Sequence, residues 1–254
     1  MKNKILISFT LASLLGSSLF ANNIELTTNK NKTIISLGLL TQNSTLDTRS
    51  TEHGSNDFGD NLSYKGNIIF PISNINKYSE IFLEIGGIYN NNYYYMHYPT
   101  TNSIDKDYLI KDNNFHTKIG YSINIEDFNF QLSGVLNYKD YSYNNKFNQD
   151  SSFDSYFLGF ELGIFKEIKK DFSMGINYSC LYGQNITLKE YYSDFEYNNI
   201  DMDLIEYGIQ VPFSYKFTNN FSSNISLNYS LLKDNSSSFE NKKTEIEFNI
   251  NYIF

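Results

Sequence analysis

Polar and apolar residues alternate with period two along most of the chain. The pattern is clearest in residues 245–254, which read Glu-Ile-Glu-Phe-Asn-Ile-Asn-Tyr-Ile-Phe. Because successive side chains of a strand point to opposite faces, Ile246 and Phe248 share one face, and Glu245 and Glu247 share the other. The sequence therefore predicts a strand here with one apolar and one polar face.

Ten segments carry this alternation, and each is close to the ~9 to 11 residues of a tilted membrane strand. They are 33–41, 62–70, 80–89, 114–123, 128–138, 155–165, 172–182, 203–217, 221–231 and 245–254. Pro212 lies inside the eighth segment, and because proline cannot donate to a ladder we expect a bulge there. A further short strand at Ile24 to Thr28 is an alternative.

The connections between these segments alternate in length. The short ones are 71–79, 124–127, 166–171 and 218–220, and the long ones are 42–61, 90–113, 139–154, 183–202 and 232–244. Short turns at one end and long loops at the other are typical of transmembrane barrels. The pattern predicts an all-β protein, a closed antiparallel up-and-down transmembrane β-barrel of ten strands, with eight or twelve as alternatives. A soluble β-sandwich would also give alternating strands, but it would not expose ten aromatic-rich faces.

The first residues have the features of a secretory signal peptide. Lys2 and Lys4 precede an apolar run at 5–15, and the cleavage region Ser17-Ser18-Leu19-Phe20-Ala21 follows, in which Leu19 departs from the usual preference for small residues. We expect cleavage after Ala21, with cleavage after Ser18 as the alternative. The predicted organisation is a signal peptide over 1–21 and a barrel over 22–254.

Composition and charge narrow the class of partner. The formal charge is -8 and becomes -10 once the two lysines of the signal are removed, which excludes nucleic acid as a partner. The chain has 22 Tyr and 21 Phe but a mean hydropathy of -0.41. A barrel reconciles these values because its outward residues are apolar and its inward residues polar. Cys180 is the single cysteine, so no intrachain disulfide forms.

The apolar residues Phe248, Ile250, Tyr252 and Phe254 form a pattern that resembles the closing strand of bacterial outer-membrane β-barrel proteins. In that family, a carboxy-terminal Phe preceded by alternating apolar residues is the signal for the barrel-assembly machinery. The resemblance implies export under a signal peptide and location in the bacterial outer membrane. It implies outer-membrane lipid, lipopolysaccharide and the assembly machinery as partners, and we expect a monomer.

The other face of the ten segments would line the lumen. It is rich in Ser, Asn and Gly, with charged residues among them. These are Lys65, Glu80, Glu84, His116, Lys118, Glu161, Glu206, Lys216, Glu245 and Glu247. One interpretation is structural, with carboxylates and lysines paired across the lumen. The other is a narrow, water-filled channel with a weak preference for cations.

Two candidate catalytic groups have a family resemblance. His53-Gly54-Ser55-Asn56 resembles the His-x-Ser-Asn element of outer-membrane phospholipase A and the lipid A deacylases, which implies Ser55 as nucleophile and His53 as base. The element lies in a predicted loop among turn-forming residues. A ten-stranded barrel also resembles the omptin proteases. The candidate residues for an omptin-like site are His97, His116, Asp201 and Asp203. No metal-ligand spacing or cofactor motif occurs, so we expect no metal and no cofactor.

The sequence favours a structural or surface-interaction role over enzymatic activity. The long connections contain the Tyr-rich segments Tyr93 to Tyr98 and Tyr191 to Phe195, and exposed aromatic residues are frequent at binding hot spots. A porin-like channel is the alternative function, and an acyl hydrolase that uses His53 and Ser55 is the second alternative.

Overall fold

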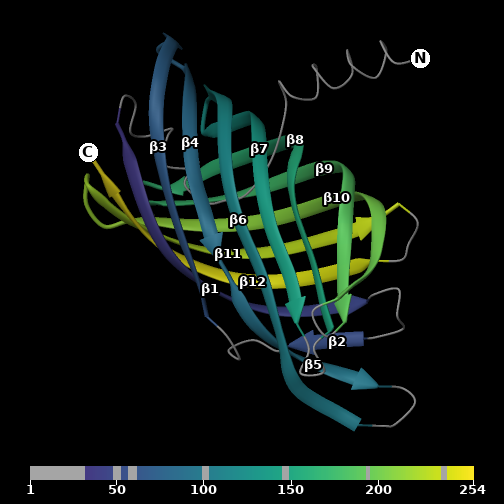
Figure 1. Ribbon diagram of the computed structural model, residues 1–254. Coiled ribbons are helices and arrows are strands. Elements are labelled where there is room, and N and C mark those ends of the chain that lie inside the picture. The colour runs from purple at the N-terminus through teal and green to yellow at the C-terminus, as the bar shows by residue number, and fades with distance from the viewer. Residues whose placement is uncertain are drawn as a thin grey trace, which may run out of the picture.

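The computed structural model describes residues 32–47, 53–56, 62–98, 103–144, 149–192, 195–235 and 239–254. Within them the chain forms one antiparallel sheet that closes on itself (Figure 1). No helix in the described ranges is long and apolar enough to span a membrane. The predicted signal peptide and the alternative strand at Ile24 to Thr28 lie outside the described residues.

Ten of the twelve strands close the barrel, which confirms the predicted fold class and strand number. The order around the ring is β1, β3, β4, β6, β7, β8, β9, β10, β11 and β12, and β12 pairs with β1 from Ile34↔Ile253 to Asp47↔Glu240. The strands are β1 (Ile34–Asp47), β2 (His53–Asn56), β3 (Ser63–Asn76), β4 (Ser79–Tyr89), β5 (Asn91–Tyr98), β6 (Ser103–Ile125), β7 (Phe128–Asn144), β8 (Gln149–Lys169), β9 (Phe172–Tyr192), β10 (Phe195–Lys216), β11 (Phe221–Asp234) and β12 (Glu240–Ile253).

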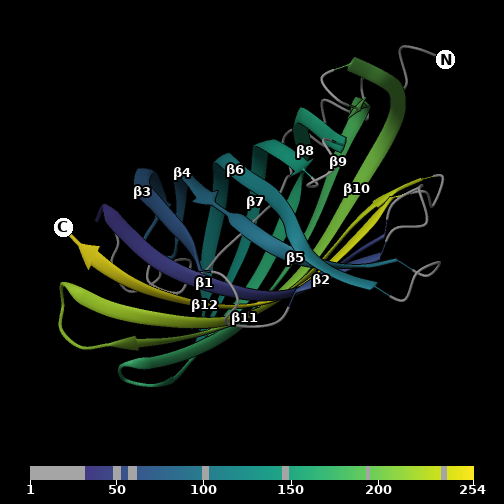
Figure 2. The same ribbon diagram turned by 60° about the horizontal axis from the view of Figure 1, so that its bottom comes forward.

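The two ends of the barrel differ. We call the end with the tight turns, among them Lys77–Tyr78 and Glu126–Asp127, the turn end, and the opposite end the loop end. In outer-membrane barrels the short turns face the periplasm. Figure 2 shows β2, β5 and the outer part of β10 toward the loop end and the carboxy-terminal residue at the turn end.

The short strands β2 and β5 lengthen the wall at the loop end, where the alternation pattern predicts loops. β2 pairs with residues 44–47 of β1 and with β5, and β5 pairs with β6. Asn90 connects β4 to β5: its side chain donates to Gln42 Oε1 (3.1 Å) and accepts from Ser63 Oγ (2.8 Å). The described residues of the predicted loops 42–61 and 90–113 are therefore almost all strand.

Four strands run far beyond the membrane. β6, β8, β9 and β10 have 23, 21, 21 and 22 residues, about twice the ~9 to 11 residues that cross a bilayer. The predicted loops 139–154, 183–202 and 232–244 are accordingly strand over most of their described residues.

Polarity inverts in these outer parts. Phe153, Phe157 and Met202 are buried inside the barrel, whereas Asp154 and Asp201 are exposed on its outer face. This arrangement is that of a soluble β-protein, with apolar residues inside and polar residues outside. The buried cluster is Tyr141, Phe153, Phe157, Leu181, Ile186, Leu188, Ile200, Met202, Leu204, Leu232 and Phe239. Its core packing stabilises the protruding wall without lipid.

The lower part of the barrel has the outward apolar face that the alternation predicts. Leu37 is 69 % exposed, and Phe248, Ile250, Tyr252 and Phe254 are all exposed on the outer face of the wall. Rings meet there in pairs: Phe221 lies 4.9 Å from Tyr252, centroid to centroid. This band suits the lipid acyl chains and the aromatic belts at their borders.

Two prolines lie within described strands, and at both of them the structure differs from the prediction. The predicted turn 71–79 is wrong: β3 continues through Pro71 to Asn76, with register shifts that absorb the irregularity, and only Lys77 and Tyr78 turn. The bulge predicted at Pro212 is also wrong, because the register to β9 is the same on both sides of it, from Gln210↔Asn177 to Phe213↔Met174. The ladder to β9 instead lacks pairing at Val211 and Pro212, where the proline has no N–H to donate, while Pro212 pairs with Ser226 on β11.

The last two residues allow the predicted assembly signal to be separated from stability. Ile253 is fully buried against Ile34, Ile69 and Phe82, so Ile253→Ala should lower the free energy of unfolding by about 2–5 kcal/mol. Phe254 is 59 % exposed, so Phe254→Ala should leave that energy nearly unchanged but reduce the heat-modifiable fraction in the outer membrane. Urea titration and gel mobility measure the two effects, and equal losses in both variants would contradict the signal role.

Candidate functional site: the barrel interior

The inward side chains form three layers along the barrel axis. Ile34, Ile69, Phe82 and Ile253 make an apolar layer near the turn end. The apolar cluster of the outer strands fills the loop end. Between them lies the polar layer, which contains most of the charged residues assigned to the lumen from sequence.

Glu84 on β4 is the centre of one charged group in the polar layer. Lys118 Nζ lies 3.2 Å from Glu84 Oε2 and 3.3 Å from Glu161 Oε2, so one lysine joins β4, β6 and β8. Glu84 Oε1 also lies 3.0 Å from His116 Nε2 and accepts a hydrogen bond from Asn67 Nδ2 (3.1 Å). Glu84 and Lys118 are 0 % exposed, so water does not screen their attraction.

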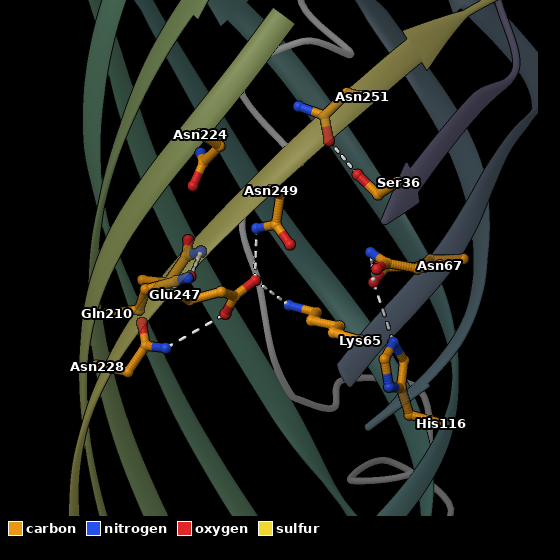
Figure 3. A network of polar contacts seen from close by, with 12 residues as sticks. Ser36, Lys65, Asn67, His116, Gln210, Asn224, Asn228, Glu247, Asn249 and Asn251 are labelled. Atoms are coloured by element: carbon orange, nitrogen blue, oxygen red, sulfur yellow. Dashed lines mark hydrogen bonds and ion pairs between the residues drawn. The ribbon is translucent and has the colours of Figure 1, made fainter. Parts of the chain in front are cut away.

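Glu247 on β12 is the centre of a second group (Figure 3). Lys65 Nζ donates to its Oε1 at 2.7 Å, and Asn249 Nδ2 donates to the same oxygen at 2.6 Å. Asn228 Nδ2 donates to Oε2 at 3.3 Å. A buried carboxylate that accepts three hydrogen bonds, one of them from a lysine, has its desolvation offset within the network.

Two further ion pairs cross the interior between strands that are not neighbours. Lys139 on β7 lies 3.0 Å from Glu206 Oε2 on β10, and Lys243 on β12 pairs with Asp112 on β6. Sequence reasoning missed Lys139, Asp112 and Lys243 because it placed them in loops beyond the strand ends. Continuing the inward parity of each strand would have found all three.

Carboxylates outnumber lysines in the buried interior. Among the described residues, eight carboxylates and four lysines are buried: Glu80, Glu84, Asp112, Glu161, Glu206, Asp234, Glu245 and Glu247 against Lys65, Lys118, Lys139 and Lys243. Lys216, which the sequence predicts among the lumen charges, is only partly buried and lies at the turn end. Amides and hydroxyls bind one another in the rest of the layer, as in Asn177 Nδ2 to Gln210 Oε1 (3.0 Å).

A cavity of about 510 Å³ opens among the tight turns. Lys77, Lys166 and Lys216 contribute to its walls together with Glu126 and Asp171. Phe165 and Asn129, both buried, lie at its inner side. The ring of Phe165 occupies the space that a side chain at Gly163 or Gly175 would need. The cavity therefore borders the polar layer without joining its buried ion pairs.

Among the candidate catalytic residues, His116, Asp201 and Asp203 have side chains that the structure describes, and these three do not come together. The His53 to Asn56 element lies in strand β2 instead of the predicted loop. His116 is buried in the polar layer, whereas Asp201 and Asp203 belong to the outer face, where Asp201 accepts from Thr187 Oγ1 (3.0 Å). The side chains that the structure describes contain no group of three His, Cys, Asp or Glu able to hold a metal ion.

Comparison with known proteins gives a fold. No family model matches the chain, and no curated protein matches its sequence. The outer membrane protease OmpT from Escherichia coli is similar in structure, with a TM-score of 0.55 and 12 % identity over 89 % of this chain and 98 % of that chain. An outer membrane channel from Pseudomonas putida F1 has a TM-score of 0.50 and 9 % identity over 88 % and 96 %.

This chain has the fold of the bacterial outer-membrane β-barrel proteins. A third similar structure is Ail, the attachment invasion locus protein of Yersinia pestis, with a TM-score of 0.40 and 12 % identity over 88 % of this chain and 98 % of that chain. The barrel fold and the exposed apolar band agree with the outer-membrane location expected from sequence. Proteins with this fold include a protease and a channel, so the fold does not assign an activity.

Proposed function

We propose that this outer-membrane barrel is a monomer with a closed interior and that it has a structural or surface-interaction role. The observation that carries the proposal is the set of buried ion pairs between strands that are not adjacent, such as Lys139 with Glu206 and Lys118 with Glu161. These pairs occupy the interior that a conducting channel would need for water.

A ten-stranded barrel lies between the filled eight-stranded kind and the open sixteen-stranded porins. In this chain Glu84, Lys118 and Glu247 are 0 % exposed, although all three are charged and inward. Ions crossing the polar layer would have to break hydrogen-bonded pairs in a medium of low dielectric constant, which is costly. These facts favour a sealed barrel over the narrow channel.

The loop end offers the surface for interaction. The Tyr-rich segment Tyr93 to Tyr98 lies in β5, and residues 191–192 and 195 lie at the ends of β9 and β10. A backbone already held in strands loses less conformational freedom on binding than a free loop does. We propose these segments as the contact region for molecules outside the cell and assign no catalytic role to the chain.

Conductance across a planar bilayer tests the sealed interior. The refolded protein should insert without producing channel events, because buried ion pairs such as Lys139 with Glu206 occupy the polar layer. A gel that shows the heat-modifiable form first establishes that the inserted protein is folded. Steady conductance would overturn the proposal, and a preference for cations would then follow from the excess of buried carboxylates.

The hydrolase alternative has a separate test. A fluorophosphonate probe reacts with serines activated by a base. We expect no labelling of the folded protein, and labelling lost in Ser55→Ala would establish the hydrolase instead.

A further inference from the structure

The cavity among the tight turns has a buried donor that no side chain uses. Ser173 on β9 lines this cavity and is only 8 % exposed. Its hydroxyl has no hydrogen-bond partner among the residues that the structure describes. Burying a hydroxyl without a partner is unfavourable, so this group is free to bind a molecule that enters the cavity.

Two further groups lie beside Ser173. Ser214 on β10 is its direct partner in the register, so their Cβ atoms are about 4.5–5.5 Å apart. The Ser214 hydroxyl accepts from Asn224 Nδ2 (2.9 Å) and donates to no described residue. Lys216 follows two residues later on the same face of β10 and forms no ion pair with a described carboxylate. We call Ser173, Ser214 and Lys216 the floor of the cavity, which offers two hydroxyls and one ammonium group.

The rim of the cavity contributes the opposite charge. Glu126, Asp127, Glu167 and Asp171 line it, and all four are exposed. Glu167 is the direct partner of Ser173 on β8. None of these carboxylates forms an ion pair with a described lysine. A simple anion on the floor would be repelled by the rim, whereas a ligand that carries a carboxylate and an ammonium group satisfies both.

We propose that the cavity binds a small zwitterion of the amino-acid or short-peptide class, with its carboxylate on the floor and its ammonium group toward the rim. Hydrogen bonds to an ionised carboxylate are stronger than those between neutral groups. The cavity of about 510 Å³ lies within the ~300–1,000 Å³ of small-molecule sites, and the Phe165 ring gives it an apolar wall. The site opens at the turn end, so it is independent of the contact region proposed at the loop end.

The first experiment is equilibrium dialysis of the refolded full-length barrel in detergent with radiolabelled L-dialanine. We expect one dipeptide per chain. N-acetyl-dialanine lacks the ammonium group and dialanine amide lacks the carboxylate, so each should bind at least about tenfold more weakly, the effect of one hydrogen bond to a charged group. Absence of saturable dialanine binding, or equal binding of the three dipeptides, would overturn the proposal.

Two variants test the floor. Ser173→Ala should weaken dialanine binding about tenfold and leave the heat-modifiable fraction unchanged, because the hydroxyl has no described partner to lose. Lys216→Met should weaken binding by at least the same factor. The matched control is Lys169→Met, which changes an exposed lysine at the end of β8 that does not line the cavity. Equal affinity in Ser173→Ala, Lys216→Met and Lys169→Met would contradict a site on this floor.

The second experiment locates the ligand by acetylation of lysines, followed by mass spectrometry. Dialanine should slow the acetylation of Lys216, which lies on the floor, and leave the rate at Lys169 unchanged. The two blocked dipeptides should protect neither lysine. Equal protection of both lysines by dialanine would show non-specific binding and overturn the assignment.

Discussion

Lys118→Met is expected to lower the free energy of unfolding of the barrel by about 3–5 kcal/mol, the usual cost of removing one partner from a buried ion pair. Lys118 contacts both Glu84 and Glu161, so the change leaves two carboxylates inside the barrel without their shared cation. Methionine retains most of the side-chain volume, and the loss is therefore electrostatic. Urea titration in detergent, followed by tyrosine fluorescence or gel mobility, measures it.

The matched control is Lys111→Met on the same strand. Lys111 is exposed, and exposed charges contribute at most about 1 kcal/mol. Adding Glu84→Gln and Glu161→Gln to Lys118→Met should recover part of the stability, since no uncompensated charge remains. A loss in Lys111→Met as large as that in Lys118→Met would show that the ion pairs do not hold the interior together.

Glu84→Gln alone should also destabilise the barrel, because Lys118 and His116 both contact Glu84.

Gly159→Ala is expected to prevent formation of the stable barrel or to cost more than the ~1–3 kcal/mol that overpacking usually costs. A Cβ at Gly159 would lie 1.9 Å from the backbone oxygen of Cys180 and 2.6 Å from Leu181 Cα. These atoms belong to the paired strand β9, so relief requires the β8 and β9 ladder to separate. The heat-modifiable fraction on a gel is the direct measure.

Gly66→Ala provides the comparison. A Cβ at Gly66 would meet no atom closer than 3.7 Å, from the Leu37 side chain, on the outward face of β3. The substitution should leave the heat-modifiable fraction unchanged. If both alanine variants fold equally well, the close approach of β8 and β9 is not a constraint.

The sequence predicted the lower barrel well because lipid and lumen impose opposite polarity on successive residues. Leu37 and Ile250 are exposed outside, and Lys65 and Glu247 are buried inside, as the alternation requires. The outer strands were missed for a physical reason. Above the membrane the same alternation has apolar residues such as Phe153 inside, and Asp154 outside resembles a loop residue.

The partners of the interior charges were beyond reach of the sequence. The alternation indicates that Lys118 and Glu161 point inward. Whether they pair depends on the distance between β6 and β8 across the interior, which the sequence does not give. The pairing of β2 with β5 was missed for a related reason. These two segments belong to different connections of the barrel and become neighbours only through the register of the strands.

The closing ladder between β1 and β12 sets the order of events during biogenesis. Ile34 pairs with Ile253, so β1 and β12 each lack one of their two neighbouring strands until the whole chain has been made. Contacts this distant in sequence make folding slow, since the closure entropy must be overcome before they form. Until β12 is added, the edge of β1 that pairs with β12 remains open over all fourteen residues of the strand. An open strand edge is a template for aggregation. The protein therefore depends on being kept apart from other chains throughout its passage to the membrane.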